Sequence, residues 1–251
     1  MPPLSRILTR FYPEAKLGGF ARNEHRVIFY TRVNALLNQD MVVLDYGAGR
    51  GKWPEFEEGY QLALTTLKGK CRKVIGVDVD PVVSGNPLVD EGIPIELDGR
   101  LPFADESIDM IVSWAVFEHV TNPKAVAAEL NRVLKPGGYI CCWTPNRWSY
   151  FAIAAQLVPS SLHARVLQRV QPGGRAEKDV FPTAYRLNTK AAIRRWFPDR
   201  QFENYSYIFS GPPSYHGERL PLALLWAAWN WLLPSSFGQT MHIFLRKRAA
   251  P

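Results

Sequence analysis

The sequence is poor in cysteine, with only Cys71, Cys141 and Cys142 among 251 residues. Three thiols without paired spacing exclude a disulfide framework and a zinc knuckle. Cys141 and Cys142 are adjacent, so on a strand their side chains would point to opposite faces. We therefore expect reduced thiols, no metal site and a cytoplasmic setting.

Long apolar runs and secretion signals are also missing. No run reaches the roughly 20 residues that a transmembrane helix needs, and the segment MPPLSRILTRFYPEAK is interrupted by prolines and lacks an apolar core. Acidic residues are scarce late in the chain, where residues 145–251 hold 14 Lys and Arg against 5 Asp and Glu. This surplus could attract nucleic acid, an anionic membrane or a phosphorylated substrate, or it could be scattered solubilising charge.

What the sequence does have is the run VVLDYGAGRG at residues 42–51. Residues 42–44 read as a buried parallel strand that closes on Asp45. Three glycines spaced two apart follow, which lets the backbone turn tightly and approach a ligand. A dinucleotide loop needs glycine at the first, third and sixth positions, and here the sixth position from Gly47 is Lys52. The run therefore predicts a ligand at a strand end, but not a nicotinamide or flavin dinucleotide.

Strands and helices are predicted to alternate over the first 144 residues, which is typical of a doubly wound parallel sheet. The expected strands are 42–44, 73–78, 93–97, 108–113 and 139–144, and the expected helices are 22–38, 55–68 and 123–134, the last closed by KPGG at 135–138. Residues 145–186 break this pattern, with short helices expected near 150–157 and 161–170. Regular elements then resume as a helix at 188–197, a strand near 202–208, an apolar segment at 220–233 and a last strand at 240–246.

Two further strand ends carry groups that suit a nucleoside. Asp78 closes VIGVD, 27 residues beyond Gly51, where a carboxylate can accept hydrogen bonds from two ribose hydroxyls. Asp98 and Gly99 follow the third strand, where an acceptor and a backbone N–H can face an adenine ring.

Four motifs in order resemble the class I S-adenosylmethionine (SAM)-dependent methyltransferases, most closely the small-molecule ubiquinone/menaquinone-methylase type. They are the glycine run, VIGVD, LDGRLPFADESIDMIVSWAVFEHV at 97–120 and LKPGGYICCWTPN at 134–146. The resemblance implies an α/β Rossmann-like fold, with a mostly parallel seven-stranded sheet and helices on both faces. It also implies one domain over 1–251: an N-terminal cover helix (1–40), a SAM-binding core (41–146), variable substrate-pocket or lid insertions (147–239), and a last strand with a basic tail (240–251).

The resemblance assigns cofactor roles. Asp45, Gly47 and Gly49 would form the methionine side, Asp78 would hold the ribose, and Asp98 and Gly99 would face the adenine. Ser113 and Trp114 would line the methyl-donor side, and Ala48 and Val79 complete the set. Enzymes that methylate amino nitrogens of DNA bases or glutamine resemble one another in an Asn/Asp-Pro-Pro-aromatic run, which here reads SWAV (113–116), so these substrates are excluded.

The acceptor side is less defined. Glu118 and His119 are the first candidates for a general base, although this pair could instead cap a helix or tie down a loop. Tyr185, Arg186 and His216 are candidate substrate residues, with the segment DVFPTAYRLNT (179–189) open to the alternative of a packing loop. His163 and Asp179 could also approach an acceptor, and a carbon or acid acceptor would need no base.

The segment LPLALLWAAWNWLL (220–233) is apolar on nearly every side and contains three tryptophans. At 1.5 Å per residue it spans about 21 Å, short of a bilayer core. We expect a helix buried against the sheet or at a homodimer contact, with peripheral membrane contact as the alternative. The basic RKR (246–248) would be a solvated tail, or would touch anionic lipid beside this segment.

The leading hypothesis is SAM-dependent methylation of a small molecule, at oxygen. Methylation of RNA, motivated by the basic C-terminal part, lacks a recognisable RNA-binding module. A non-catalytic SAM-binding or membrane-surface protein is the third reading.

Overall fold

The fold is built around one sheet. The computed structural model describes residues 5–55, 57–97, 99–157 and 182–249. Within these residues eight strands follow the order β3-β2-β1-β4-β5-β8-β6, with β7 also paired to β8. The first five run parallel and β8 runs antiparallel to β5. The strands are β1 (Val42–Tyr46), β2 (Lys73–Asp78), β3 (Glu91–Pro94), β4 (Ile108–Trp114), β5 (Leu134–Pro145), β6 (Phe202–Asn204), β7 (Tyr207–Phe209) and β8 (Thr240–Lys247).

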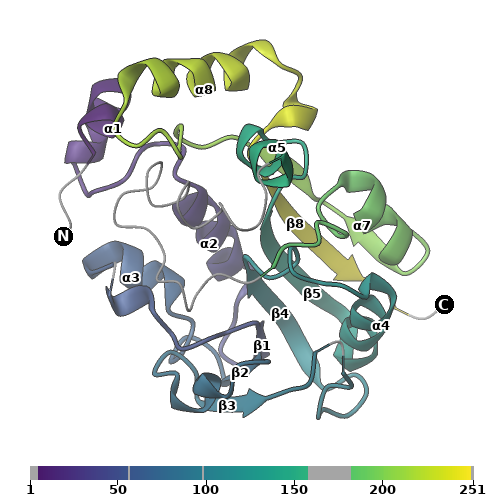
Figure 1. Ribbon diagram of the computed structural model, residues 1–251. Helices are drawn as coiled ribbons and strands as arrows, with labels where there is room; N and C mark the ends of the chain where they lie inside the picture. The colour runs from purple at the N-terminus through teal and green to yellow at the C-terminus, as the bar shows by residue number, and fades with distance from the viewer. Residues whose placement is uncertain (1–4, 56, 98, 158–181, 250–251) are drawn as a thin grey trace.

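Helices cover both faces of the sheet, with α2 and α3 on one side and α4 and α7 on the other (Figure 1). The α-helices are α1 (Arg6–Phe11), α2 (His25–Leu36), α3 (Gly59–Thr65), α4 (Pro123–Val133), α5 (Tyr150–Leu157), α7 (Lys190–Trp196) and α8 (Leu220–Leu232). Short 3₁₀ helices are η1 (Pro13–Lys16), η2 (Trp53–Glu55), η3 (Pro81–Gly85) and η5 (Ser235–Phe237).

Alternating side chains of the central strands pack into two separate hydrophobic cores, one on each face of the sheet. On β4, Ile111 packs with the core under α4 and α7, whereas Met110 and Val112 join the core under α2. Cys142 and Cys141 divide in the same way, as their adjacency predicts, and both are buried free thiols. Burial on both faces explains why these strands read as continuous apolar runs. The predicted Rossmann-like architecture is confirmed.

The predicted strand at 202–208 is instead two short strands, so the expected seven strands become eight. The side chain of Asn204 accepts a hydrogen bond from the N–H of Ser206 at 3.0 Å. The N–H of Phe244 in turn donates to the Ser206 hydroxyl rather than to a backbone carbonyl. This local turn interrupts the ladder with β8, because a side-chain acceptor replaces a ladder partner.

Two helix boundaries also differ from expectation. The helix expected at 55–68 is η2 followed by a short α3, so Pro54 lies in η2 rather than opening α3. KPGG does not close α4, which ends at Val133, because Leu134 is already extended and pairs with Ile108. Gly137, with φ of 80°, therefore serves an irregularity inside β5. The helix expected at 161–170 lies outside the described residues.

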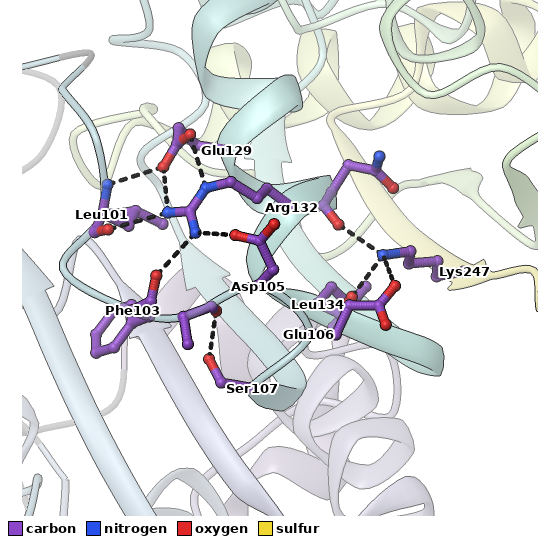
Figure 2. Close-up of polar contacts among 11 residues, drawn as sticks. Leu101, Phe103, Asp105, Glu106, Ser107, Glu129, Arg132, Leu134 and Lys247 are labelled. Atoms are coloured by element: carbon purple, nitrogen blue, oxygen red, sulfur yellow. Dashed lines mark hydrogen bonds and ion pairs between the residues drawn. The ribbon is translucent and has the colours of Figure 1, made fainter.

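Arg132 on α4 fastens the loop between β3 and β4 (Figure 2). Its guanidinium donates to the carbonyls of Leu101 and Phe103 at 3.0 and 2.8 Å and to the Asp105 carboxylate at 2.7 Å. The carboxylate of Glu129 accepts two more hydrogen bonds from Arg132, and it also accepts the N–H of Leu101 at 2.9 Å. The pairing with Arg132 lowers the pKa of Glu129. The LPFADES stretch is thus held in place by charged hydrogen bonds, which are about twice as strong as neutral ones.

The basic residues 246–248 are not a free tail. Lys247 donates to the carbonyls of Asn131 and Leu134 and reaches Glu106 (Figure 2). Arg248 donates to the carbonyl of Asp199 at 2.9 Å. They lie toward α4 and α7, away from α8 (Figure 1). The interpretation of RKR as a tail is therefore wrong for Arg246 and Lys247, which belong to β8, although Arg246 and Arg248 are exposed to solvent as expected.

The expectation that 220–233 is buried against the sheet is also wrong. The segment forms α8, which runs over the top of the molecule in Figure 1, with Ala223 as its one buried residue. The sequence could not decide this orientation, because a helix that is apolar all round has no polar face to mark the solvent side. In the described part of the chain, no helix is long and apolar enough to cross a membrane.

Candidate functional site

The glycine loop after β1 turns back across the carboxyl end of the sheet. Gly47 and Gly49 have φ of 81° and 54°, a left-handed backbone that favours glycine. A Cβ at Gly47 would lie 2.2 Å from Val116 Cγ2, so the backbone here packs directly against the segment after β4. Both the turn and this close approach require glycine at position 47.

Asp78 is held rigidly beside this loop. Its carboxylate accepts hydrogen bonds from the N–H of Gly49 at 2.8 Å and from the N–H of Asp80 at 2.9 Å. Each oxygen keeps a lone pair, since a carboxylate accepts about four hydrogen bonds. A Cβ at Gly49 would meet only the Asp78 carboxylate, at 3.9 Å. The space over Gly49 is therefore open to a ligand whose hydroxyls bond to Asp78.

A cavity of about 960 Å³ extends from the glycine loop to the segments around α1, α5 and α8. The strand ends contribute the glycine loop (45–53), Asp78 and Val79, residues 95–97, residues 114–116 and Trp143. The remaining lining includes Ser5, the N-cap residue of α1, Leu8 of α1, residues 24–26, Phe151 of α5, residues 212–218, Gln239 and Thr240. This volume is at the upper end of ligand pockets, about 300–1,000 Å³, so it has room for a nucleoside cofactor and an acceptor together.

Asp45 is an enclosed acid in this pocket. Burial, and then the nearby Asp78 carboxylate, raise its pKa to about 7. Tyr30, which lines the same pocket, also has a raised pKa, because of burial and of Asp45. A buried carboxylate with raised pKa lacks a compensating cation. Asp45 is therefore suited to receive the ammonium group of a ligand.

An aromatic wall stands next to these acids. The Trp114 and Trp143 rings stack at 4.3 Å with an angle of 8° between them, and Tyr30 stacks on Trp114 at 5.7 Å. Arg26 lies over Trp53, 4.5 Å from the ring centroid, and forms an ion pair with the buried Glu57. Tryptophan faces attract cations. Arg26, which also lies 5.6 Å from the Trp114 centroid, already takes the cation position here, so these rings form a packed wall of the pocket.

Most of the predicted cofactor residues line this one pocket: Asp45, Gly47, Ala48, Gly49, Asp78, Val79 and Trp114. Ser113 does not, because its side chain is fully buried and its hydroxyl donates to the carbonyl of Tyr46 at 2.8 Å. Gly99 is also absent from the lining, where Glu96 and Leu97 of the same segment stand instead. Asp98 lies outside the described residues.

The two candidate bases differ in their access to the pocket, although His119 Nε2 lies 3.9 Å from a carboxylate oxygen of Glu118. His119 lines the pocket, and its Nδ1 lies 2.8 Å from the carbonyl oxygen of Pro182. Glu118 does not line it: only 2% exposed, it accepts a hydrogen bond from Thr144 at 2.9 Å, and its carbonyl accepts the N–H groups of Ala184 and Tyr185. Glu118 therefore ties the segment after residue 182 to the sheet, as the alternative reading had it.

Among the substrate candidates, only His216 lies in the pocket lining. Its Nδ1 accepts the N–H of Glu218 at 3.1 Å. Tyr185 is buried with φ of 51°, and Arg186 donates to the carbonyl of Thr121, so both serve the packing of this segment. His163 and Asp179 lie outside the described residues.

His25, on the first turn of α2, is a pocket residue that sequence reasoning missed. Its ring nitrogens lie 2.8 Å from the Gln239 side chain and 3.1 Å from the Thr240 hydroxyl. Burial lowers its pKa, so the ring is held neutral. Its partners are more than 200 positions away, and no local motif marks such a pair. Among the described residues, no group of three metal-ligating side chains is placed to hold an ion.

The glycine loop, the paired strand-end acids and the sheet order together define the class I SAM-dependent methyltransferases, whose cofactor is S-adenosylmethionine. A family model described as a methyltransferase domain matches residues 20–207. The chain belongs to that family. The residues fit the cofactor, because the open space over Gly49 faces the Asp78 carboxylate, which can accept hydrogen bonds from two hydroxyls, and the Asp45 carboxyl group lines the same pocket.

Curated relatives match only parts of the chain. A protein of Mycolicibacterium smegmatis named "probable S-adenosylmethionine-dependent methyltransferase" is 31% identical over 131 residues, 50% of this chain and 46% of its own. An uncharacterised methyltransferase of Mycolicibacterium paratuberculosis is 38% identical over 101 residues, 38% of this chain and 36% of its own. The chain thus spans less than half the length of these relatives.

Solved structures share the fold at low identity. A Haloferax volcanii methyltransferase, solved in complex with the Trm112 activator, superposes with a TM-score of 0.54 at 18% identity, over 89% of this chain and 91% of that one. The [4+2]-cyclase SpnF gives 0.55 at 15% identity, over 97% and 94%. A cyclase among them means that the fold alone does not decide the reaction.

Proposed function

We propose that this chain transfers the methyl group of SAM to a hydroxyl oxygen of a small molecule. The observation that carries the proposal is the Asp78 carboxylate, fixed by two backbone N–H groups beside the open space over Gly49. This arrangement is prepared for a vicinal diol before any ligand arrives. Its location at the carboxyl ends of parallel strands is where nucleosides bind in such sheets.

The pocket supports a division of labour among its acids. Asp78 and Val79 would hold the ribose, Asp45 would pair with the ammonium of the methionine part, and Glu96 with Leu97 would border the adenine. The stacked Trp114 and Trp143 would border the methyl-donor side of the pocket. SAM supplies a methyl group on a good leaving group, so the protein has mainly to orient donor and acceptor.

His119 is the residue proposed to take the acceptor's proton. A carbonyl oxygen only accepts hydrogen bonds, so the contact with Pro182 places the ring proton on Nδ1. Nε2 is then the nitrogen that would take the proton, and the Glu118 carboxylate, 3.9 Å away, would stabilise the resulting imidazolium. A positioned base of this kind contributes typically about 10²–10⁴ in rate. His216 lines the same pocket and would contact the acceptor.

The test is titration calorimetry with S-adenosylhomocysteine, the demethylated product. Wild-type protein should bind, and Asp78→Ala should bind at least about tenfold more weakly, since two hydrogen bonds to a charged group are lost. Asp40→Ala, an exposed acid next to β1, should bind as the wild type does. No binding by the wild type at millimolar concentration would overturn the proposal, and normal binding by Asp78→Ala would overturn the ribose assignment.

A further inference from the structure

The helix α8 presents an apolar face to solvent. Its sequence, LPLALLWAAWNWL, contains no charged residue. The most exposed side chains recur at helical spacing: Leu224 (50%), Leu225 (54%), Trp231 (84%) and Leu232 (67%). At 100° per residue they fall on one side of the helix. Helices on protein surfaces normally turn a polar face toward water. Here the exposed side is apolar, and these four side chains are called face 224–232 below.

This orientation is fixed by contacts of α8 residues that lie outside the exposed face. Trp226 stacks on Tyr150 of α5 at 4.3 Å and 10°. The indole N–H of Trp229 donates to the carbonyl of Phe237 at 3.2 Å, and Ala223 is buried. These contacts hold α8 along its length, so rotating the leucines inward would break a ring stack and a hydrogen bond. The exposed face is a built feature of the fold.

Positive charge lies beside the start of α8. Arg219 caps the start of α8, and Arg6 and Arg10 lie exposed on α1, which is next to the start of α8 in Figure 1. Glu218 is the acid at this end, and Glu14 pairs with Arg22. The border of the face is therefore net basic.

We propose that α8 docks flat on an anionic lipid surface through face 224–232. Leucine and tryptophan on one side of a short helix, bordered by arginine, is the chemistry of an interfacial helix. Tryptophan prefers the membrane–water boundary, and Trp231 is the most exposed member of the face. The basic border matches an anionic headgroup layer, whereas a second copy of this chain would bring arginine against arginine.

The elements around α8 also line the pocket, so docking of α8 would determine where the acceptor enters. Residues 212–218 lead directly into α8 and line the cavity, together with Ser5 and Leu8 of α1. On α5, Phe151 lines the cavity while its neighbour Tyr150 supports Trp226. A docked α8 therefore places the acceptor end of the pocket at the lipid. Resting on the proposed methyl transfer, we infer that the acceptor is an amphiphile drawn from the membrane.

The docking is tested by flotation with two kinds of vesicle, phosphatidylcholine alone and phosphatidylcholine mixed with phosphatidylglycerol. Wild-type protein should float with the mixed vesicles, and Leu225→Gln/Trp231→Gln/Leu232→Gln should float about tenfold less. Val82→Gln/Tyr205→Gln, which removes exposed apolar side chains from η3 and from the β6–β7 turn, should float as the wild type does. Arg6→Gln/Arg10→Gln should weaken flotation only with the mixed vesicles.

Three results would overturn the docking. They are a wild-type protein that stays in the dense fraction with both vesicles, a triple variant that floats normally, or a dimer on size-exclusion chromatography that the triple variant dissolves. S-adenosylhomocysteine binding by the same variants keeps the two proposals apart. If the wild type binds S-adenosylhomocysteine but does not float, only the docking proposal is overturned. If it floats but does not bind S-adenosylhomocysteine, only the methyl-transfer proposal is overturned.

Discussion

The ionised carboxylate of Asp45 lowers the stability of the fold, although the same charge is proposed to bind the ammonium group of the ligand. Its pKa is raised from 3.8 to about 7 in the folded chain. The folded state thus holds this proton more tightly than the unfolded state, and stability declines as the pH rises from about 4 to about 7. A shift of this size corresponds to roughly 4 kcal/mol.

We expect Asp45→Asn to raise the free energy of unfolding at about pH 8, by up to roughly 4 kcal/mol, and to change it little at about pH 4. Urea denaturation at both pH values measures this, with the exposed Asp40→Asn as control. The same variant should bind S-adenosylhomocysteine more weakly, because the ammonium loses its counter-charge. An equal effect on stability at both pH values would contradict the buried charge as its cause.

Gly47 and Gly49 both have positive φ, yet they should respond differently to alanine. At position 47 the new methyl would meet Val116, so Gly47→Ala should cost roughly 3 kcal/mol of stability. At position 49 it would enter open space, so Gly49→Ala should cost only about 1 kcal/mol. Gly49→Ala should nevertheless abolish product binding. Thermal unfolding and calorimetry separate the two effects, and equal loss of stability would contradict the difference in packing.

At the scale of elements, α4 and the loop before β4 act as one unit through Arg132. Arg132→Met should destabilise the fold by roughly 2–3 kcal/mol, because Glu129 and the carbonyls of Leu101 and Phe103 lose a charged donor. Urea denaturation measures the change. Arg194→Met, at an exposed site on α7, should be close to neutral. A neutral Arg132→Met would mean that the loop is held by packing alone.

The elements that could be predicted from the sequence are those whose burial leaves a local pattern. The strands β1, β2, β4 and β5 are apolar runs because both of their faces are covered. The orientation of α8 could not be predicted, since its residues are apolar on every side. The break between β6 and β7 depends on the Asn204 side chain, which a strand pattern does not reveal.

The residues of the candidate site also differ in whether a local sequence pattern reveals them. Asp45 and Asp78 lie at the ends of β1 and β2, and the glycines follow β1, so their convergence could be predicted from the order of the chain. His25 also lines the pocket, and it is held there by hydrogen bonds to Gln239 and Thr240 that only the fold creates. Glu118 and His119 are neighbours in sequence, but only His119 lines the pocket. Local spacing does not tell which of two adjacent side chains faces a cavity.

At the scale of the whole molecule, the pocket draws residues from α1 to β8, so ligand binding should stabilise the entire fold. At a hundred times its dissociation constant, S-adenosylhomocysteine should add about 2.7 kcal/mol. For a chain of this size that raises the melting temperature by about 5–10 °C. Differential scanning fluorimetry measures the shift, which Asp78→Ala should largely lose. A shift of the same size in Asp78→Ala would place the bound product elsewhere.

Because β8 lies between β5 and β6 in the sheet but comes last in the chain, the sheet can be completed only late in translation. Gly47 emerges from the ribosome long before Gln239 and Thr240, which line the same cavity and bond to His25. While the chain is being translated, β5 lacks its neighbour, and the edge that β8 will cover is unpaired. Until β8 has been made, a growing chain exposes an open sheet edge that can pair with other nascent chains.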